Sequence, residues 1–251
     1  MLFLVDCQAS MLEGNRHNEQ QVSNVEQILR AFQSFMKNKV ISNENDKLGL
    51  VFYNCSQSQN TLSSKGVAVL LALETPDAEQ IKEVERVYQL ILQGQIKHLA
   101  DKQNKPVRAN LSEALQIVLA EFRKVQKDAF NQKVYLFTNQ QEPDSDKERE
   151  AVKQKAKDLE NQGVDIELFA MSDPKVDNPT FDIAKFFGEI VTYDEDEAKE
   201  GLVGLHGTEM RIGELMKRIR QKEHRKRIQG KCLFAISPET SIGLKFYTTV
   251  I

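Results

Sequence analysis

The chain has 251 residues, of which 40% are hydrophobic and 28% charged, a composition typical of folded globular domains. Its formal net charge of -3 excludes a uniformly basic nucleic-acid binder, so any DNA contact has to come from a local basic patch. The three cysteines, Cys7, Cys55 and Cys232, form no CxxC pair, which argues against a zinc site or a disulfide framework. No apolar run approaches the roughly 18 residues that a membrane span needs, so no membrane contact is expected.

Short, continuously apolar runs alternate along the chain with amphipathic stretches. Apolar runs bounded by polar turns are typical of strands buried on both faces of a sheet, and apolar residues three and four apart are typical of helices. The predicted strands span 2–5, 48–53, 67–73, 134–137, 164–171 and 190–193. The predicted helices span 22–36, 81–91, 111–125 and 146–162, the last closed by Gly163, with short helices at 183–187 and 210–219.

This alternation predicts an α/β domain over residues 1–216, with a doubly wound, mainly parallel sheet and helices on both faces. Because the first strand begins at Leu2 without a preceding polar segment, we expect an upstream segment before it. Ligands of such folds bind at the carboxyl ends of the strands, near the topological switch point. The sequence places Asp6 and Asn139 there.

Two regions depart from the alternating pattern. Residues 194–200 form an acidic cluster, which we interpret as a solvated loop. Residues 217–231 then hold eight Lys or Arg against one Glu, and we assign 217–230 as a basic junction. Two β-rich runs follow, separated by the turn signal of residues 237–240, so that 231–251 resembles the start of a second, all-β domain.

No catalytic or cofactor motif occurs in the sequence. Neither GxGxxG nor GxxxxGK[ST] is present, and no GxSxG elbow is found, so nucleotide binding and acyl transfer lack support. The histidines have no metal-ligand spacing; they are His17, His98, His206 and His224. We therefore expect no enzyme activity and no cofactor.

The segment from Asp6 to Ser10 resembles the DxSxS metal-ion motif of von Willebrand factor A domains. In that family a divalent cation is also held by a Thr from a TNLxxAL-like segment and by an Asp after the fourth strand. Here Gln8, Ala109 and Asn139 replace the first Ser, the Thr and the second Asp. One carboxylate and one hydroxyl make a poor cation site, so we expect no bound metal. Asp6 and Ser10 are expected to hydrogen-bond neighbouring loop amides instead.

Several segments, in this order and spacing, resemble the 70-kDa-type subunit of the Ku family. The most specific are the aromatic stretch FDIAKFF with the following EIV, and the basic stretch IRQKEHRKR that runs into a β-rich tail. The supporting segments are LFLVD at 2–6, LVFY at 50–53 and LFTN at 136–139. The resemblance covers nearly the whole chain and implies a von Willebrand A-like domain followed by the first strands of an incomplete β-barrel at 231–251.

The resemblance implies a non-catalytic scaffold subunit that binds double-stranded DNA ends as a heterodimer with the 80-kDa-type subunit. It further implies a nuclear protein that acts in double-strand break repair by non-homologous end joining and in telomere maintenance, with end-joining repair factors as partners. In that family a β-barrel and a bridge from both chains encircle the DNA. The A-type domain lies at the periphery, where it mediates protein contacts.

The basic junction is predicted to make the main phosphate contacts of this chain. Outside 217–231, acids outnumber basic residues by 36 to 26, so a phosphate backbone would be repelled elsewhere and attracted here. A solvated linker and a nuclear-import signal remain alternatives for the same run. The predicted DNA-binding residues are Lys222, Arg225, Lys226, Arg227 and Lys231.

The polar helix at 146–162 is predicted to present a partner surface that includes Arg149 and Lys153, with a plain solvated helix as the alternative. Its other side is expected to pack on the sheet through Ala151, Ala156 and Leu159. Two other functions remain open for the whole chain. One is an A-type protein-interaction domain unrelated to DNA repair, and the other is a nuclease that uses Asp6. The loss of metal ligands argues against a metal-dependent form of either.

Overall fold

The computed structural model describes residues 1–14, 22–42, 46–55, 59–93, 109–125, 132–173, 181–191, 216–217, 219–220, 228–237 and 240–247. The chain divides into two compact units, Met1–Leu215 and Met216–Ile251. The first contains a five-stranded sheet and the second a two-stranded sheet. No helix among the described residues is both long enough and apolar enough to cross a membrane.

The sheet of the first unit has the order β3-β2-β1-β4-β5. Strand β1 pairs in parallel with β2 and β4, and β4 pairs in parallel with β5, whereas β3 is antiparallel to β2. This mainly parallel sheet confirms the predicted fold class. The strands are β1 (Leu2–Asp6), β2 (Leu48–Tyr53), β3 (Val67–Glu74), β4 (Gln132–Thr138) and β5 (Val164–Ala170).

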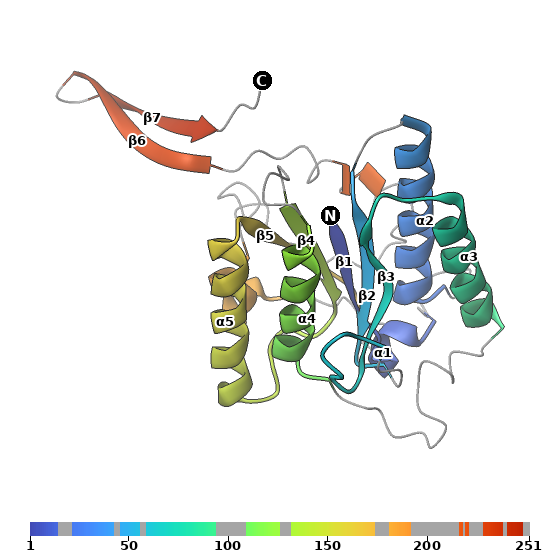
Figure 1. The fold of residues 1–251 in the computed structure, drawn as a ribbon. Coiled ribbons are helices and arrows are strands. Elements are labelled where there is room, and N and C mark those ends of the chain that lie inside the picture. Colours follow the sequence, from blue (N-terminus) through green and yellow to red (C-terminus); the bar gives the residue numbers. More distant parts are fainter. Residues whose placement is uncertain are drawn as a thin grey trace. The chain divides into compact units, whose positions relative to one another are not determined.

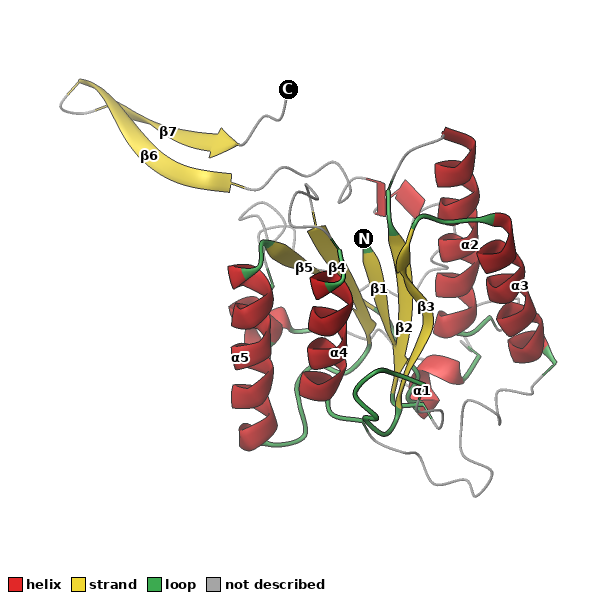
Figure 2. Ribbon diagram, in the orientation of Figure 1, coloured by secondary structure: helices red, strands yellow, loops and turns green. Residues whose placement is uncertain are grey.

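Helices cover both faces of the sheet (Figures 1 and 2). Helices α4 and α5 pack against each other on one face, and α2 covers the other face with α3 beside it. Two short 3-10 helices, η2 and η3, follow β5. The helices are α1 (Ala9–Leu12), α2 (Asn24–Ser42), α3 (Ala78–Leu92), α4 (Leu111–Arg123), α5 (Asp146–Asn161), η2 (Ile183–Lys185) and η3 (Phe187–Glu189).

The core lies on both sides of the central strands. On the α2 face, Phe3 of β1 contacts Phe32 of α2 edge-on, with ring centroids 4.8 Å apart, and stacks on Phe137 of β4 at 5.2 Å. On the other face, α4 and α5 bury apolar side chains together with residues of β1, β2, β4 and β5. All five residues of β1 are buried, as expected for a central strand of a parallel sheet.

The ends of α5 follow local sequence signals. The Ser145 side chain accepts a hydrogen bond from the Glu148 N–H at 3.3 Å and so caps the first turn. Gly163, just after the helix, has a φ of +79°, a left-handed conformation that glycine adopts without strain. The predicted helix and its glycine C-terminus are therefore confirmed.

The strand predicted at 190–193 is wrong for the two residues of it that are described. The backbone N–H groups of Ile190 and Val191 both donate to the carbonyl of Phe187, at 3.0 Å each. These local turn bonds continue from η3, so the donors are not available to a sheet. The acidic stretch 194–200 lies outside the described residues, as does most of the helix predicted at 210–219.

The second unit contains a β-hairpin of β6 (Ile228–Ser237) and β7 (Thr240–Tyr247), paired antiparallel. Strand β6 begins three residues before the expected domain boundary at 231, so the end of the basic run lies within it. Phe234 and Ile242 are opposite each other in the register and are 59% and 48% exposed. The hairpin therefore presents an apolar pair.

Candidate functional site

Polar side chains gather at the carboxyl ends of β1, β2 and β4. Asp6 ends β1, Asn54 directly follows β2 and Thr138 ends β4. Because β2 and β4 flank β1 on opposite sides, this edge is the topological switch point of the sheet. The prediction that Asp6 and Asn139 lie at this edge is confirmed.

Asp6 is fully buried and accepts hydrogen bonds on both carboxylate oxygens. Its Oδ1 accepts from the Gln8 backbone N–H at 3.0 Å and from Asn54 Nδ2 at 2.8 Å. Its Oδ2 accepts from the Thr138 hydroxyl at 2.8 Å. The expected bond from Asp6 to a loop amide is confirmed, and the two side-chain donors add to it.

Burial sets the charge behaviour of this cluster. Loss of solvation raises the pKa of Asp6 above its ordinary value, and the bonds from Asn54, Gln8 and Thr138 oppose that rise. The neighbouring Tyr53 is also buried, and burial with the nearby Asp6 charge raises its pKa well above the usual range. The tyrosine therefore stays neutral at physiological pH.

Gln8, Ser10 and Asn139 form a second, half-exposed cluster beside Asp6. Gln8 Nε2 donates to Asn139 Oδ1, and the Ser10 hydroxyl lies 3.1 Å from Asn139 Oδ1 and 3.0 Å from its Nδ2. The amide that Ser10 contacts belongs to a side chain rather than to the loop backbone. The residues at three motif positions therefore bond one another.

Asn54 is a site residue that the sequence did not reveal. It has a φ of +58°, a left-handed conformation that asparagine tolerates better than most residues. Its Nδ2 donates to Asp6, and its Oδ1 accepts from the Ala109 backbone N–H at 3.0 Å. Asn54 thus ties the ends of β1 and β2 to the segment before α4. The one available signal was an asparagine directly after a buried strand.

The residues at this edge do not fit a divalent cation. Such a cation needs several oxygen ligands with their lone pairs free, preferably from more than one carboxylate. Both oxygens of Asp6 already accept bonds, Gln8 and Asn139 bond each other, and Ala109 offers only a methyl group. Over the described ranges, no three His, Cys, Asp or Glu side chains are placed to hold a metal.

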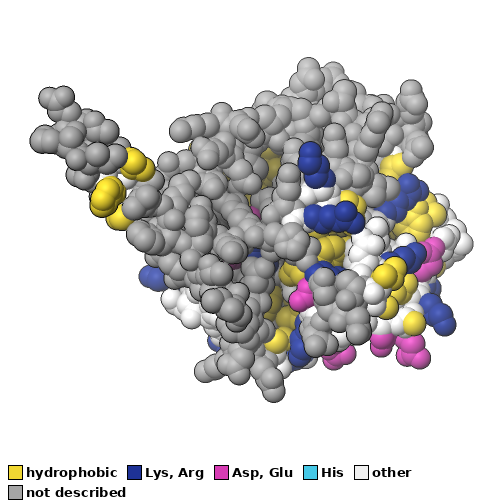
Figure 3. Space-filling model, turned by 90° about the horizontal axis from the view of Figure 1, so that it is seen from above, with side chains coloured by type: hydrophobic (Ala, Val, Ile, Leu, Met, Phe, Trp, Pro, Cys, Tyr) yellow, Lys and Arg dark blue, Asp and Glu magenta, His cyan; other side chains and the backbone are white. Residues whose placement is uncertain are grey.

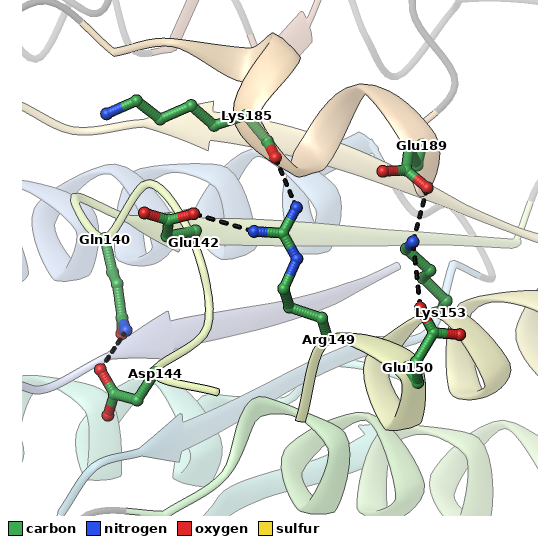
Figure 4. A network of polar contacts seen from close by, with 8 residues as sticks. All are labelled: Gln140, Glu142, Asp144, Arg149, Glu150, Lys153, Lys185 and Glu189. Atoms are coloured by element: carbon green, nitrogen blue, oxygen red, sulfur yellow. Dashed lines mark hydrogen bonds and ion pairs between the residues drawn. The ribbon is translucent and has the colours of Figure 1, made fainter. Parts of the chain in front are cut away.

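The predicted partner residues Arg149 and Lys153 lie one turn apart on α5 (Figure 4). Arg149 Nη1 pairs with Glu142 Oε2 at 2.9 Å, and Nη2 donates to the Lys185 carbonyl at 2.8 Å. The guanidinium carbon also lies 5.3 Å from the ring centroid of Phe186. Lys153 Nζ pairs with Glu189 Oε2 at 2.8 Å, and this contact raises the pKa of Lys153.

Arg149 and Lys153 therefore both contact other residues of the chain, and their contact with a partner stays a prediction. The segment 181–191 lies against this side of α5, with Phe186 and Phe187 buried in the same core cluster as Val152 of α5. Arg149 and Lys153 hold this segment through its backbone, an aromatic ring and a carboxylate. Of the predicted packing residues, Ala156 and Leu159 are buried as expected, whereas Val152 is buried in place of Ala151.

The structure describes only one of the five predicted DNA-binding residues. Lys222, Arg225, Lys226 and Arg227 lie outside the described residues. Lys231 lies in β6, in register with Lys245 of β7. On the described part of the face shown in Figure 3, Lys and Arg side chains are interspersed with acidic and apolar ones.

Residues 1–229 match the family model of the Ku70/Ku80 N-terminal alpha/beta domain. The mouse X-ray repair cross-complementing protein 6 is 29% identical over 256 residues, covering 100% of this chain and 40% of the relative. The ATP-dependent DNA helicase 2 subunit KU70 of Arabidopsis thaliana is 23% identical, covering 98% and 41%. The ATP-dependent DNA helicase ku70 of Dictyostelium discoideum is 24% identical, covering 92% and 26%.

Among solved structures, the VWA domain of SpRpn10 matches with a TM-score of 0.48 at 14% identity, covering 77% of this chain and 82% of that one. The chain spans about 40% of the length of the mouse relative. The family model covers all the described helices and strands of the first unit, from β1 to η3. The chain therefore belongs to the Ku70/Ku80 N-terminal α/β domain family.

Proposed function

We propose that this chain is part of a 70-kDa-type Ku subunit that binds double-stranded DNA ends together with an 80-kDa-type subunit. The observation that carries the proposal is the family match over residues 1–229. The 70-kDa type is supported by the names of the plant and Dictyostelium relatives. The setting is double-strand break repair by non-homologous end joining and telomere maintenance in the nucleus, with end-joining repair factors as partners.

The proposed subunit is a scaffold and not an enzyme. Several relatives carry the name ATP-dependent DNA helicase. This chain lacks the GxxxxGK[ST] loop that would cradle nucleotide phosphates. The polar groups at the switch point bond one another and leave Asp6 without an exposed oxygen. We therefore assign protein contacts to the α/β domain.

DNA contact is proposed for the basic junction at 217–230 and the β-rich segment at 231–251. Lys222, Arg225, Lys226, Arg227 and Lys231 supply positive charge in a chain that is otherwise acidic. The apolar pair on the hairpin needs a cover, which the further strands of a β-barrel would supply. Contacts from Lys and Arg to phosphates are independent of sequence, as DNA-end binding requires.

A competition assay tests this function. The full-length protein, co-expressed with its 80-kDa-type partner, is incubated with a labelled linear duplex and excess unlabelled DNA. We expect linear competitor to displace the label and closed circular competitor of equal mass to leave it bound. Equal displacement by both competitors, or failure of the two subunits to co-purify, would contradict the proposal.

A further inference from the structure

The Asn54 carboxamide joins the end of β1 to the segment before α4. Its Nδ2 donates to Asp6 Oδ1 at 2.8 Å, and its Oδ1 accepts from the Ala109 backbone N–H at 3.0 Å. Asp6 and Ala109 stand at two of the positions that hold the cation in the A-type motif. One neutral side chain therefore spans two positions that a cation would join.

The two groups that Asn54 joins require an amide between them. The Asp6 carboxylate only accepts hydrogen bonds and the Ala109 N–H only donates, so the bridging group needs one donor and one acceptor. The φ of +58° at position 54 favours Asn, Asp or Gly. Of these three, only Asn has a side chain with both a donor and an acceptor. The asparagine is therefore specified by its backbone and by both of its partners.

The spacing of Asp6 and Asn54 suits two ligands of one divalent cation. Mg²⁺ holds oxygen atoms at about 2.0–2.1 Å in octahedral geometry, so two neighbouring oxygens lie about 3.0 Å apart. Asp6 Oδ1 and Asn54 Nδ2 are 2.8 Å apart. An oxygen in place of this nitrogen would put two carboxylates at the spacing of neighbouring ligands, and Mg²⁺ commonly binds one or two carboxylates together with water. Asn54 is partly exposed, so ions and water can reach this residue.

We propose that the Asn54 carboxamide takes the place of a divalent cation at the switch point. Asn54 is a positioning residue that holds the Asp6 carboxylate to the segment before α4. The arrangement of this edge is therefore independent of divalent cations, and a carboxylate at position 54 makes it dependent on them. This inference concerns the α/β domain alone, so its outcome does not depend on DNA-end binding by the heterodimer.

The test compares urea unfolding of the 251-residue chain in EDTA and in about 10 mM Mn²⁺, followed by circular dichroism. Asn54→Asp should be less stable than the wild type in EDTA, because two carboxylates then face each other. Mn²⁺ should lower the unfolding equilibrium constant of this variant about tenfold, the effect of a site with a Kd of about 1 mM. The unfolding equilibrium constant of the wild type should change by less than about twofold.

Two controls identify the pair of carboxylates as the ligands. The exchanged variant Asp6→Asn/Asn54→Asp has the composition of the wild type and one carboxylate at this place, so Mn²⁺ should not stabilise it. Asn161→Asp adds a carboxylate at the exposed end of α5 and should respond to Mn²⁺ as the wild type does.

The test also holds if Asn54→Asp is unfolded in EDTA. Mn²⁺ should then restore the circular dichroism spectrum of the folded chain. The proposal would be overturned if Mn²⁺ neither stabilised nor refolded Asn54→Asp. It would also be overturned if Mn²⁺ stabilised the wild type or the exchanged variant as much as it stabilised Asn54→Asp.

Discussion

Replacing Asp6 tests whether its carboxylate is the structural centre of the switch-point cluster. Asp6→Ala removes the acceptor for three donors: the Gln8 N–H, Asn54 Nδ2 and the Thr138 hydroxyl. Buried hydrogen bonds to a charged group are each worth about 1.5–3 kcal/mol, and release of the buried charge offsets part of the loss. We expect Asp6→Ala to lower the free energy of unfolding by about 3–5 kcal/mol.

Asp6→Asn is the matched control because it keeps the shape of the side chain. Its oxygen retains the two bonds at the Oδ1 position, and its amide can donate to Thr138 Oγ1, which then acts as an acceptor. We expect Asp6→Asn to lower the free energy of unfolding by about 1 kcal/mol. Urea unfolding of the 251-residue chain followed by circular dichroism measures both changes.

The wild type and Asp6→Asn also allow a test of how the stability contributed by Asp6 changes with pH. The pKa of Asp6 is raised in the folded protein from its ordinary value of 3.8, so the folded state binds this proton more tightly than the unfolded state. Stability contributed by this group is therefore greatest below its ordinary pKa and falls as pH rises through the raised, folded-state value. The asparagine does not titrate, so the advantage of the wild type over Asp6→Asn should shrink as pH rises from 4. This account of the cluster would be refuted if Asp6→Ala lowered the free energy of unfolding by less than about 1 kcal/mol. It would also be refuted if the stability advantage of the wild type over Asp6→Asn grew with pH.

Three further outcomes follow from the geometry. Calorimetry with Mg²⁺ or Mn²⁺ should show no stoichiometric site of micromolar affinity. Such a site, if it were lost in Asp6→Ala, would contradict the conclusion that the residues around Asp6 do not fit a divalent cation. Arg149→Glu should lower the free energy of unfolding by about 1–3 kcal/mol, because the variant loses the bond to the Lys185 carbonyl and the contact with the Phe186 ring and its carboxylate repels Glu142. Lys153→Glu should lower the free energy of unfolding by less than about 1 kcal/mol. Equal losses in urea unfolding would show that the ring and carbonyl contacts do not stabilise the segment. Gly163→Ala should lower the free energy of unfolding by about 1–2 kcal/mol, because of the positive φ alone, since an added Cβ meets no atom within 4 Å. Gly163→Asn should lower it by less. Unchanged thermal unfolding of both variants would be inconsistent with a left-handed glycine at the end of α5.

The sheet could be predicted because its strands carry their own signal. Each central strand is a continuous apolar run, and the polar residue that follows it necessarily lies at the carboxyl edge. The positions of Asp6 and Asn139 follow from that rule without knowledge of strand order. The helix at 146–161 could likewise be predicted from the local sequence, because Ser145 and Gly163 mark its two ends.

Features that depend on distant segments could not be predicted. Asn54 contacts Asp6, 48 residues away, and Ala109, 55 residues away, through a left-handed turn that no local pattern specifies. Arg149 looked free because the backbone that it binds, at Lys185, lies 36 residues later in the chain. The ion pair of Lys133 and Glu167, 3.6 Å apart with side chains 1% and 3% exposed, likewise depends on the register of β4 and β5.

The salt dependence of DNA binding is the most direct test of the claim that this chain contacts DNA through its basic junction at 217–230. The full heterodimer and its Arg225→Ala/Lys226→Ala/Arg227→Ala variant are titrated with a linear duplex at several salt concentrations. Each neutralised phosphate contributes about 0.9 to the slope of log affinity against log salt, so the variant should bind more weakly on every sequence, with a slope lower by roughly two to three. An assembled variant heterodimer with unchanged affinity and unchanged slope would show that the basic junction does not contact DNA.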